Sequence, residues 1–74
     1  MPKLYSARVI LSALHRAEFT TISQKGSHIK LFKRKGDKSY TVIVPNHREV
    51  AMGTFSSILN QAGMTKKEFE KFVR

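Results

Sequence analysis

Two strand patterns separated by a tight turn constrain the fold of this chain more than any other feature of its sequence. Residues 27–34 alternate apolar and polar side chains, and residues 39–44 are rich in β-branched and aromatic side chains. Between them, residues 35–38 have the composition of a turn, in which Gly36 can adopt a positive φ. The sequence therefore predicts a β-hairpin, to which the weaker strand pattern of residues 19–24 adds a third antiparallel strand.

Helical periodicity lies on both sides of this predicted sheet. Residues 6–17 and residues 54–62 each place apolar side chains at positions i, i+3, i+4 and i+7, which form one stripe of a helix. Ser6 suits the N-cap of the first helix, and Thr54 or Gly53 suits that of the second. Gly63 suits the left-handed position after the second helix. Residues 65–68 have the capping-box pattern, which predicts a short third helix.

A three-stranded antiparallel sheet is not stable alone in water, so the helices must cover one of its faces. The predicted fold class is α+β, a three-stranded antiparallel sheet packed on helices on one face, in the order αβββαα. The chain has 74 residues, which suits a single domain over residues 1–74. In the second strand Ile29 and Leu31 share the predicted core face. Alternation places Phe32 on the opposite face, but large aromatic side chains are usually buried, so its side stays open.

The charge of the chain points to a polyanionic partner. It contains 14 Lys and Arg against 5 Asp and Glu, for a net charge of +9. Nucleic acid is the first candidate, then an acidic protein, then an anionic membrane. Six of the basic residues lie in the predicted hairpin and the turn before it: Lys25, Lys30, Lys33, Arg34, Lys35 and Lys38. A solvated, solubilising face is the alternative interpretation of this cluster.

Composition also limits where the protein resides. The chain has no cysteine and therefore no disulfide. No apolar run approaches the roughly 18 residues that a membrane span needs, and no signal-peptide cleavage pattern is present. We therefore expect a cytoplasmic protein that does not insert into a membrane.

The residues that could carry chemistry are few. The five acidic residues are scattered, and no phosphate-binding loop or serine-nucleophile motif occurs, so we expect no metal and no cofactor. One route to RNA cleavage needs neither, because the ribose 2′-hydroxyl can attack its own 3′-phosphate when side chains move the protons. Histidine suits this task at neutral pH. Of the three histidines, His15 lies at a helix end, His47 follows the third strand in a loop, and His28 begins the second strand.

Four short motifs occur in a fixed order along the chain. They are G-S-H at residues 26–28, V-P-x-H at 44–47, G-T at 53–54 and I-L-x-Q-A-G at 58–63. The tripeptide alone has little specificity, whereas the ordered set is fairly specific. This set, together with the helix and strand pattern over nearly the whole chain, resembles the HicA (YcfA-type) toxins.

The resemblance implies a fold like that of a double-stranded-RNA-binding domain. It implies an endoribonuclease, a ribosome-independent mRNA interferase, that is held inactive by a HicB-type antitoxin protein. The catalytic histidine of the family falls on His28, and the histidine of the V-P-x-H motif falls on His47. The second proton donor can be His47 or a lysine. We expect mRNA to be bound by residues of the basic hairpin, namely Lys25, Gly26, Ser27, Lys30, Lys33, Arg34 and Lys35.

The chain departs from the family pattern at one position. Members commonly have glycine before the phenylalanine that follows the first helix, and this chain has Glu18 before Phe19. We therefore expect the left-handed cap of the first helix to be lost. Two other functions remain open from the residues alone: a small RNA-binding module without chemistry, and a subunit whose basic face binds an acidic protein.

Overall fold

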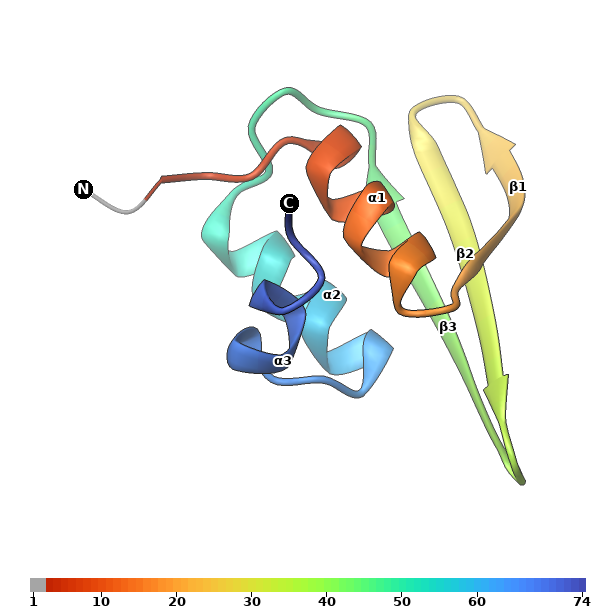
Figure 1. The fold of residues 1–74 in the computed structure, drawn as a ribbon. Helices are drawn as coiled ribbons and strands as arrows, with labels where there is room; N and C mark the ends of the chain where they lie inside the picture. Colours follow the sequence, from red (N-terminus) through yellow and green to blue (C-terminus); the bar gives the residue numbers. More distant parts are fainter. Residues whose placement is uncertain (1–2) are drawn as a thin grey trace.

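The computed structural model describes residues 3–74 and has the element order expected from the sequence. Figure 1 shows the helices lying together beside the sheet. The elements are α1 (Ala7–Arg16), β1 (Thr20–Lys25), β2 (His28–Lys35), β3 (Lys38–Pro45), α2 (Met52–Ala62) and α3 (Lys66–Glu70). The predicted α+β class is confirmed, and each strand boundary differs from the predicted one by a single residue.

The three strands form one antiparallel sheet in the order β1-β2-β3. Strands β2 and β3 pair without interruption from His28↔Pro45 to Lys35↔Lys38. The pairing of β1 with β2 shifts by one residue between Thr21 and Ser23, which is a bulge at Ile22. The β1–β2 turn and the β3–α2 connection lie at one end of the sheet, while the β2–β3 turn extends beyond the helices at the other end (Figure 1).

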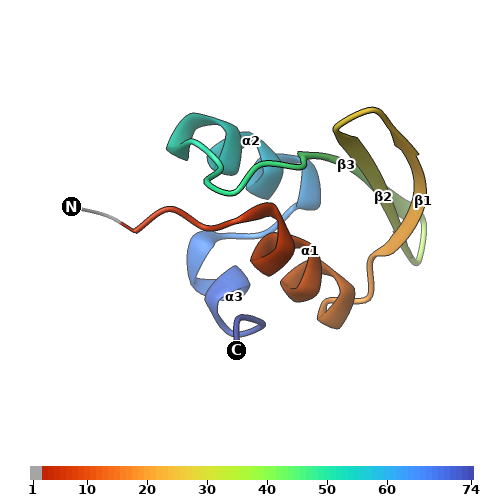
Figure 2. The same cartoon turned by 90° about the horizontal axis from the view of Figure 1, so that it is seen from above.

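The helices cover one face of the sheet, as predicted, and the other face is left uncovered (Figure 2). Ile29 and Leu31 of β2 and Val42 and Val44 of β3 are buried against the helices. Their neighbours along each strand point to the uncovered face, because successive side chains alternate. The remaining core comes from the helices and their flanking segments. Three aromatic rings, those of Tyr5, Phe55 and Phe69, pack there in tilted and edge-to-face contacts with centroids 5.0–5.4 Å apart.

Helix α1 begins as predicted and ends in a way that the sequence did not indicate. The Ser6 hydroxyl accepts a hydrogen bond from the Val9 N–H, which confirms the N-cap. The expected loss of the left-handed cap is wrong, because Glu18 itself adopts a φ of 75°. The Phe19 N–H donates to the Leu14 carbonyl at 2.9 Å, so the hydrogen bonding of a glycine cap is kept by a residue with a Cβ. Such a conformation is strained for a side chain of this kind.

Helix α2 begins two residues before its predicted start, so Gly53 lies inside the helix and does not cap it. The N-cap is Ala51, which has no side-chain hydrogen bond. The other end agrees with prediction, since Gly63 adopts a φ of 67° and the Met64 N–H donates to the Leu59 carbonyl. The predicted capping box at the start of α3 is also confirmed: its side chains are Thr65 and Glu68.

Candidate active site

Two chain segments that carry histidines meet at one end of the sheet. His28 is the first residue of β2 and lies opposite Pro45, the last residue of β3. One step outward, the Asn46 N–H donates to the Ser27 carbonyl at 2.6 Å. This bond extends the β2–β3 pairing past the strand ends. It therefore fixes the G-S-H segment relative to the P-x-H segment.

Two hydrogen bonds hold the backbone of His47. Its N–H donates to the Pro45 carbonyl, and its carbonyl accepts from the Ala7 N–H, both at 2.9 Å. Since Ala7 is the first residue of α1, the segment after β3 is tied to the start of that helix. The sequence alone favoured a loop role for His47, and the structure gives it this role together with a place beside His28.

His28 and His47 line the same hollow. Its volume is about 370 Å³, and it lies where α2 packs along the β3 edge of the sheet. Both histidines are exposed to solvent. The lining consists of two imidazoles, three polar side chains of α2 and an apolar floor: His28, Ile43, Pro45, His47, Thr54, Ser57, Ile58 and Gln61.

Gln61 connects this hollow to the sheet. Its side-chain oxygen accepts a hydrogen bond from the Ile43 N–H at 2.8 Å. This N–H lies on the outer edge of β3. The bond orients the carboxamide and holds the C-terminal half of α2 against the strand that leads to His47. Thr54 and Ser57 lie on the same side of α2, because they precede Gln61 by seven and four residues. The hollow is thus open to solvent and is lined by hydroxyl groups and two imidazoles.

The predicted RNA-binding residues separate into two groups. Lys25 lies opposite His28 in the β1–β2 pair, and Lys30 is two residues along β2 on the face that His28 shares. Gly26 and Ser27 form the turn that precedes His28, and no atom lies within 4 Å of where a Gly26 Cβ would be. The second group, called the far group, consists of Lys33, Arg34 and Lys35 at the other end of β2. An eight-residue strand spans about 23 Å, so this group lies far from His28.

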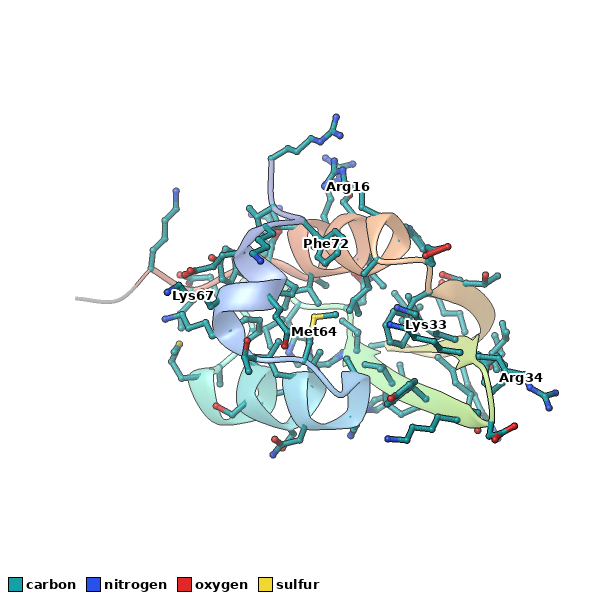
Figure 3. The ribbon with its side chains drawn as sticks, turned by 60° about the horizontal axis from the view of Figure 1, so that its bottom comes forward. Arg16, Lys33, Arg34, Met64, Lys67 and Phe72 are labelled. Carbon is teal, nitrogen blue, oxygen red and sulfur yellow. The ribbon has the colours of Figure 1, made fainter. Side chains whose placement is uncertain are left out.

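Within the far group the side chains diverge. The Lys33 ammonium lies 5.5 Å from the centre of the Phe19 ring, on the face that the helices cover. It lines a hollow with Met64 and Phe72, whereas Arg34 points away from the helices (Figure 3). Lys33 therefore contributes to packing beneath α1 and lies on the opposite face of β2 from Lys30.

Phe32 lies on the uncovered face. Its cross-strand partners are Thr20 and Thr41, which are exposed, while the ring itself is half-buried. The side that the sequence left open is thus the one that alternation predicts. An aromatic ring between Lys30 and Arg34 on an open sheet face has the arrangement used for stacking on nucleobases.

A family comparison agrees with the motifs around these two histidines. The family described as HicA toxin of bacterial toxin-antitoxin matches residues 7–64, which is most of the chain. The chain belongs to the HicA toxin family. It is a toxin of a toxin–antitoxin system, and members of this family are typically mRNA interferases. No curated protein is a significant match.

The match places this HicA toxin's two hollow-lining histidines and all of α2 inside the family region. The third histidine, His15, also lies inside it but has a different position. Its Nε2 is 2.9 Å from the Thr21 hydroxyl, near the C-terminal end of α1. His15 does not line the hollow of His28 and His47.

Sequence analysis missed two arginines near the site of this HicA toxin. Arg8 and Arg48 line a second hollow, of about 630 Å³, together with Ser6, Asn46 and His47. The two arginines are 40 positions apart in the chain, and the tie between Ala7 and His47 brings their segments together. One sequence signal existed: Arg8 is a cation in the first turn of a helix, where acidic residues are preferred.

Among residues 3–74, no group of three or more His, Cys, Asp or Glu side chains is placed to hold a metal ion. Within the same residues, no helix has the length and apolar character required to cross a bilayer.

Proposed function

We propose that this toxin is a metal-independent endoribonuclease that cleaves mRNA without the ribosome, with His28 and His47 as its proton-transfer groups. The observation that carries the proposal is that these two histidines, from separate segments, line one solvent-open hollow. The bond between Asn46 and Ser27 supports it, because it fixes the spacing of the two segments. Two positioned imidazoles supply the base and the acid that cleavage of RNA by its own 2′-hydroxyl requires.

The reaction balances without a cofactor. One imidazole accepts the 2′-hydroxyl proton while the 2′-oxygen forms a bond to phosphorus. The bond between phosphorus and the 5′-oxygen breaks, and the other imidazolium donates a proton to that oxygen. The products are a 2′,3′-cyclic phosphate and a 5′-hydroxyl end. His28 takes one of these two roles, and His47 takes the other.

The residues around His28 serve the phosphate. Lys25 and Lys30 stabilise the negative charge that develops on its oxygens, and the Ser27 hydroxyl donates to a non-bridging oxygen. Gly26 has no Cβ, and the space beside it is open, so the RNA backbone can approach closely. Phe32 provides a stacking surface on the same open face.

An antitoxin partner follows from family membership. We propose a HicB-type protein whose acidic surface covers the basic end of the sheet and the histidine hollow. The net charge of +9 favours such a partner. Charge complementarity of this kind raises the association rate more than it deepens affinity.

Cleavage of a labelled RNA in the presence of EDTA tests the proposal. The wild-type toxin is expected to cut the RNA, and His28→Ala and His47→Ala are each expected to lower the rate by about 100-fold or more. His15→Ala is the matched control, because it removes an identical side chain outside the hollow, and it should retain full activity. Circular dichroism of all three variants verifies the fold.

Two results would reject the enzyme. Full activity of His28→Ala would show that His28 does not transfer a proton in the reaction. Salt-dependent binding of RNA by the wild type without any cleavage product would instead establish an RNA-binding module without chemistry.

A further inference from the structure

The second hollow of the molecule is cationic and adjoins the histidine hollow. Its five lining residues are Ser6, Arg8, Asn46, His47 and Arg48, and none of them is acidic. His47 lines both hollows. A ligand that occupies the two hollows at once therefore passes His47.

The position of Arg8 is unfavourable for stability. It lies in the first turn of α1, which contains no acidic residue, so its charge faces the positive end of the helix dipole. Helix α3 shows the usual arrangement, with Glu68 in its first turn. Arg8 is also exposed, so burial of its side chain does not explain the residue.

An anion in the hollow removes this conflict. Arg8 comes from the start of α1 and Arg48 from the segment after β3, so the two guanidinium groups can approach one anion from two elements. Guanidinium groups bind phosphate through paired N–H donors. The Asn46 carboxamide adds a neutral donor on the same wall.

We propose that Arg8 and Arg48 bind a backbone phosphate of the RNA strand adjacent to the phosphate that is cleaved. The assignment rests on the proposed function for the identity of the ligand. His47 then lies between two phosphate positions, with Lys25 and Lys30 at the cleaved phosphate and the arginines at its neighbour. The strand must therefore extend past His47 toward the start of α1.

Salt dependence of binding measures this contact directly. The experiment uses the full chain with His28→Ala, so that a labelled single-stranded RNA stays intact, and compares it with the same chain carrying Arg8→Gln and Arg48→Gln. The control carries Lys67→Gln and Lys71→Gln, two exposed cations of the α3 region that line neither hollow. All three proteins are checked for folding by thermal melting.

Loss of one phosphate contact should make the slope of log K against log salt shallower by about 0.7. The arginine pair should bind the RNA on the order of tenfold more weakly at low salt, and the lysine pair should stay near the parent protein. Because Arg8 opposes the helix dipole, Arg8→Gln alone should melt at or above the parent temperature.

Three outcomes overturn the assignment. An unchanged slope for the arginine pair removes the phosphate contact. If the slope changes equally for the arginine and lysine variants, the effect comes from the overall charge of the protein and not from a specific contact. Unchanged RNA binding by the arginine pair, together with loss of its binding to the antitoxin in a pull-down, assigns the hollow to the protein partner. Absence of cleavage by the wild type in EDTA rejects the enzyme separately, because the slope is measured on a variant without activity.

Discussion

The glycines at the two ends of α2 allow one substitution to be made twice with opposite expected results. Gly53 lies inside the helix, and no atom is within 4 Å of where its Cβ would be. Gly63 follows the helix with a φ of 67°, and a Cβ there would lie 2.5 Å from Tyr40 Cε1. We expect Gly53→Ala to stabilise the protein and Gly63→Ala to destabilise it.

The magnitudes follow from these environments. Alanine in place of a glycine in a helix interior contributes about 0.5–1 kcal/mol, and this is the upper bound for Gly53, which lies in the first turn of α2. At Gly63 the left-handed backbone costs about 1–2 kcal/mol for alanine. Displacement of the Tyr40 ring adds about 1–3 kcal/mol, and reduced freedom of the unfolded chain returns about 0.4–1 kcal/mol. The net loss for Gly63→Ala is therefore about 1–5 kcal/mol, with a middle value of about 3 kcal/mol, which approaches the whole stability of a domain of this size.

Thermal unfolding followed by circular dichroism is the assay. At about 4–8 °C per kcal/mol, a loss of about 3 kcal/mol should lower the melting temperature of Gly63→Ala by about 10–25 °C, and Gly53→Ala should melt a few degrees above the wild type. Tyr40→Leu removes the ring atom that the Cβ would meet. A double-mutant cycle of Gly63→Ala with Tyr40→Leu should therefore show a coupling of about 1 kcal/mol or more. Equal melting temperatures for the two alanine variants would refute the assigned start of α2 and the seating of its end on Tyr40.

Three further predictions concern single residues. Glu18→Gly should raise the melting temperature by a few degrees, because it relieves a φ of 75° that costs about 1–2 kcal/mol for a residue with a Cβ; a lower melting temperature would contradict the strain. The Thr65 backbone N–H and then its hydroxyl lower the pKa of Glu68 below its ordinary value of 4.5. The capping box therefore stabilises α3 above that value and is lost as pH falls through the lowered pKa. In an NMR titration Thr65→Ala should move the Glu68 pKa upward by removing the hydroxyl while the backbone N–H remains, and an unchanged pKa would contradict the contribution of the hydroxyl. Lys30→Gln should weaken RNA binding more than Lys33→Gln, since Lys33 lies over Phe19 on the covered face; the reverse order, measured by fluorescence anisotropy, would contradict the assigned faces.

Local rules predicted the parts of this fold that local interactions determine. The Ser6 cap, the left-handed Gly63 and the capping box at Thr65 each depend on residues within one turn of the chain. The start of α2 was missed because Gly53 and Thr54 both resemble caps, whereas the helix begins after Ala51 through backbone conformation alone. Side-chain identity carries little information about such a start.

Distances in the site depend on tertiary structure, which the sequence does not encode locally. His28 and His47 are 19 positions apart and line one hollow, whereas Lys33 and Lys35 are close to His28 in sequence and lie at the far end of its strand. Arg8 and Arg48 were missed for the same reason. Alternation did predict the face of Phe32, because the β2–β3 ladder continues through it without a bulge.

The bond from Ile43 to Gln61 also affects how the sheet meets other chains. Edge strands with free N–H and C=O groups are templates on which another strand can pair. On β3 the Gln61 side chain accepts the hydrogen bond of the Ile43 N–H, so this donor is not free for another strand. On β1 the bulge at Ile22 interrupts the regular spacing of the pairing groups. Both edges of the sheet are thus less suited to pairing with another strand, which opposes growth of the sheet into amyloid-like aggregates while its open face stays free.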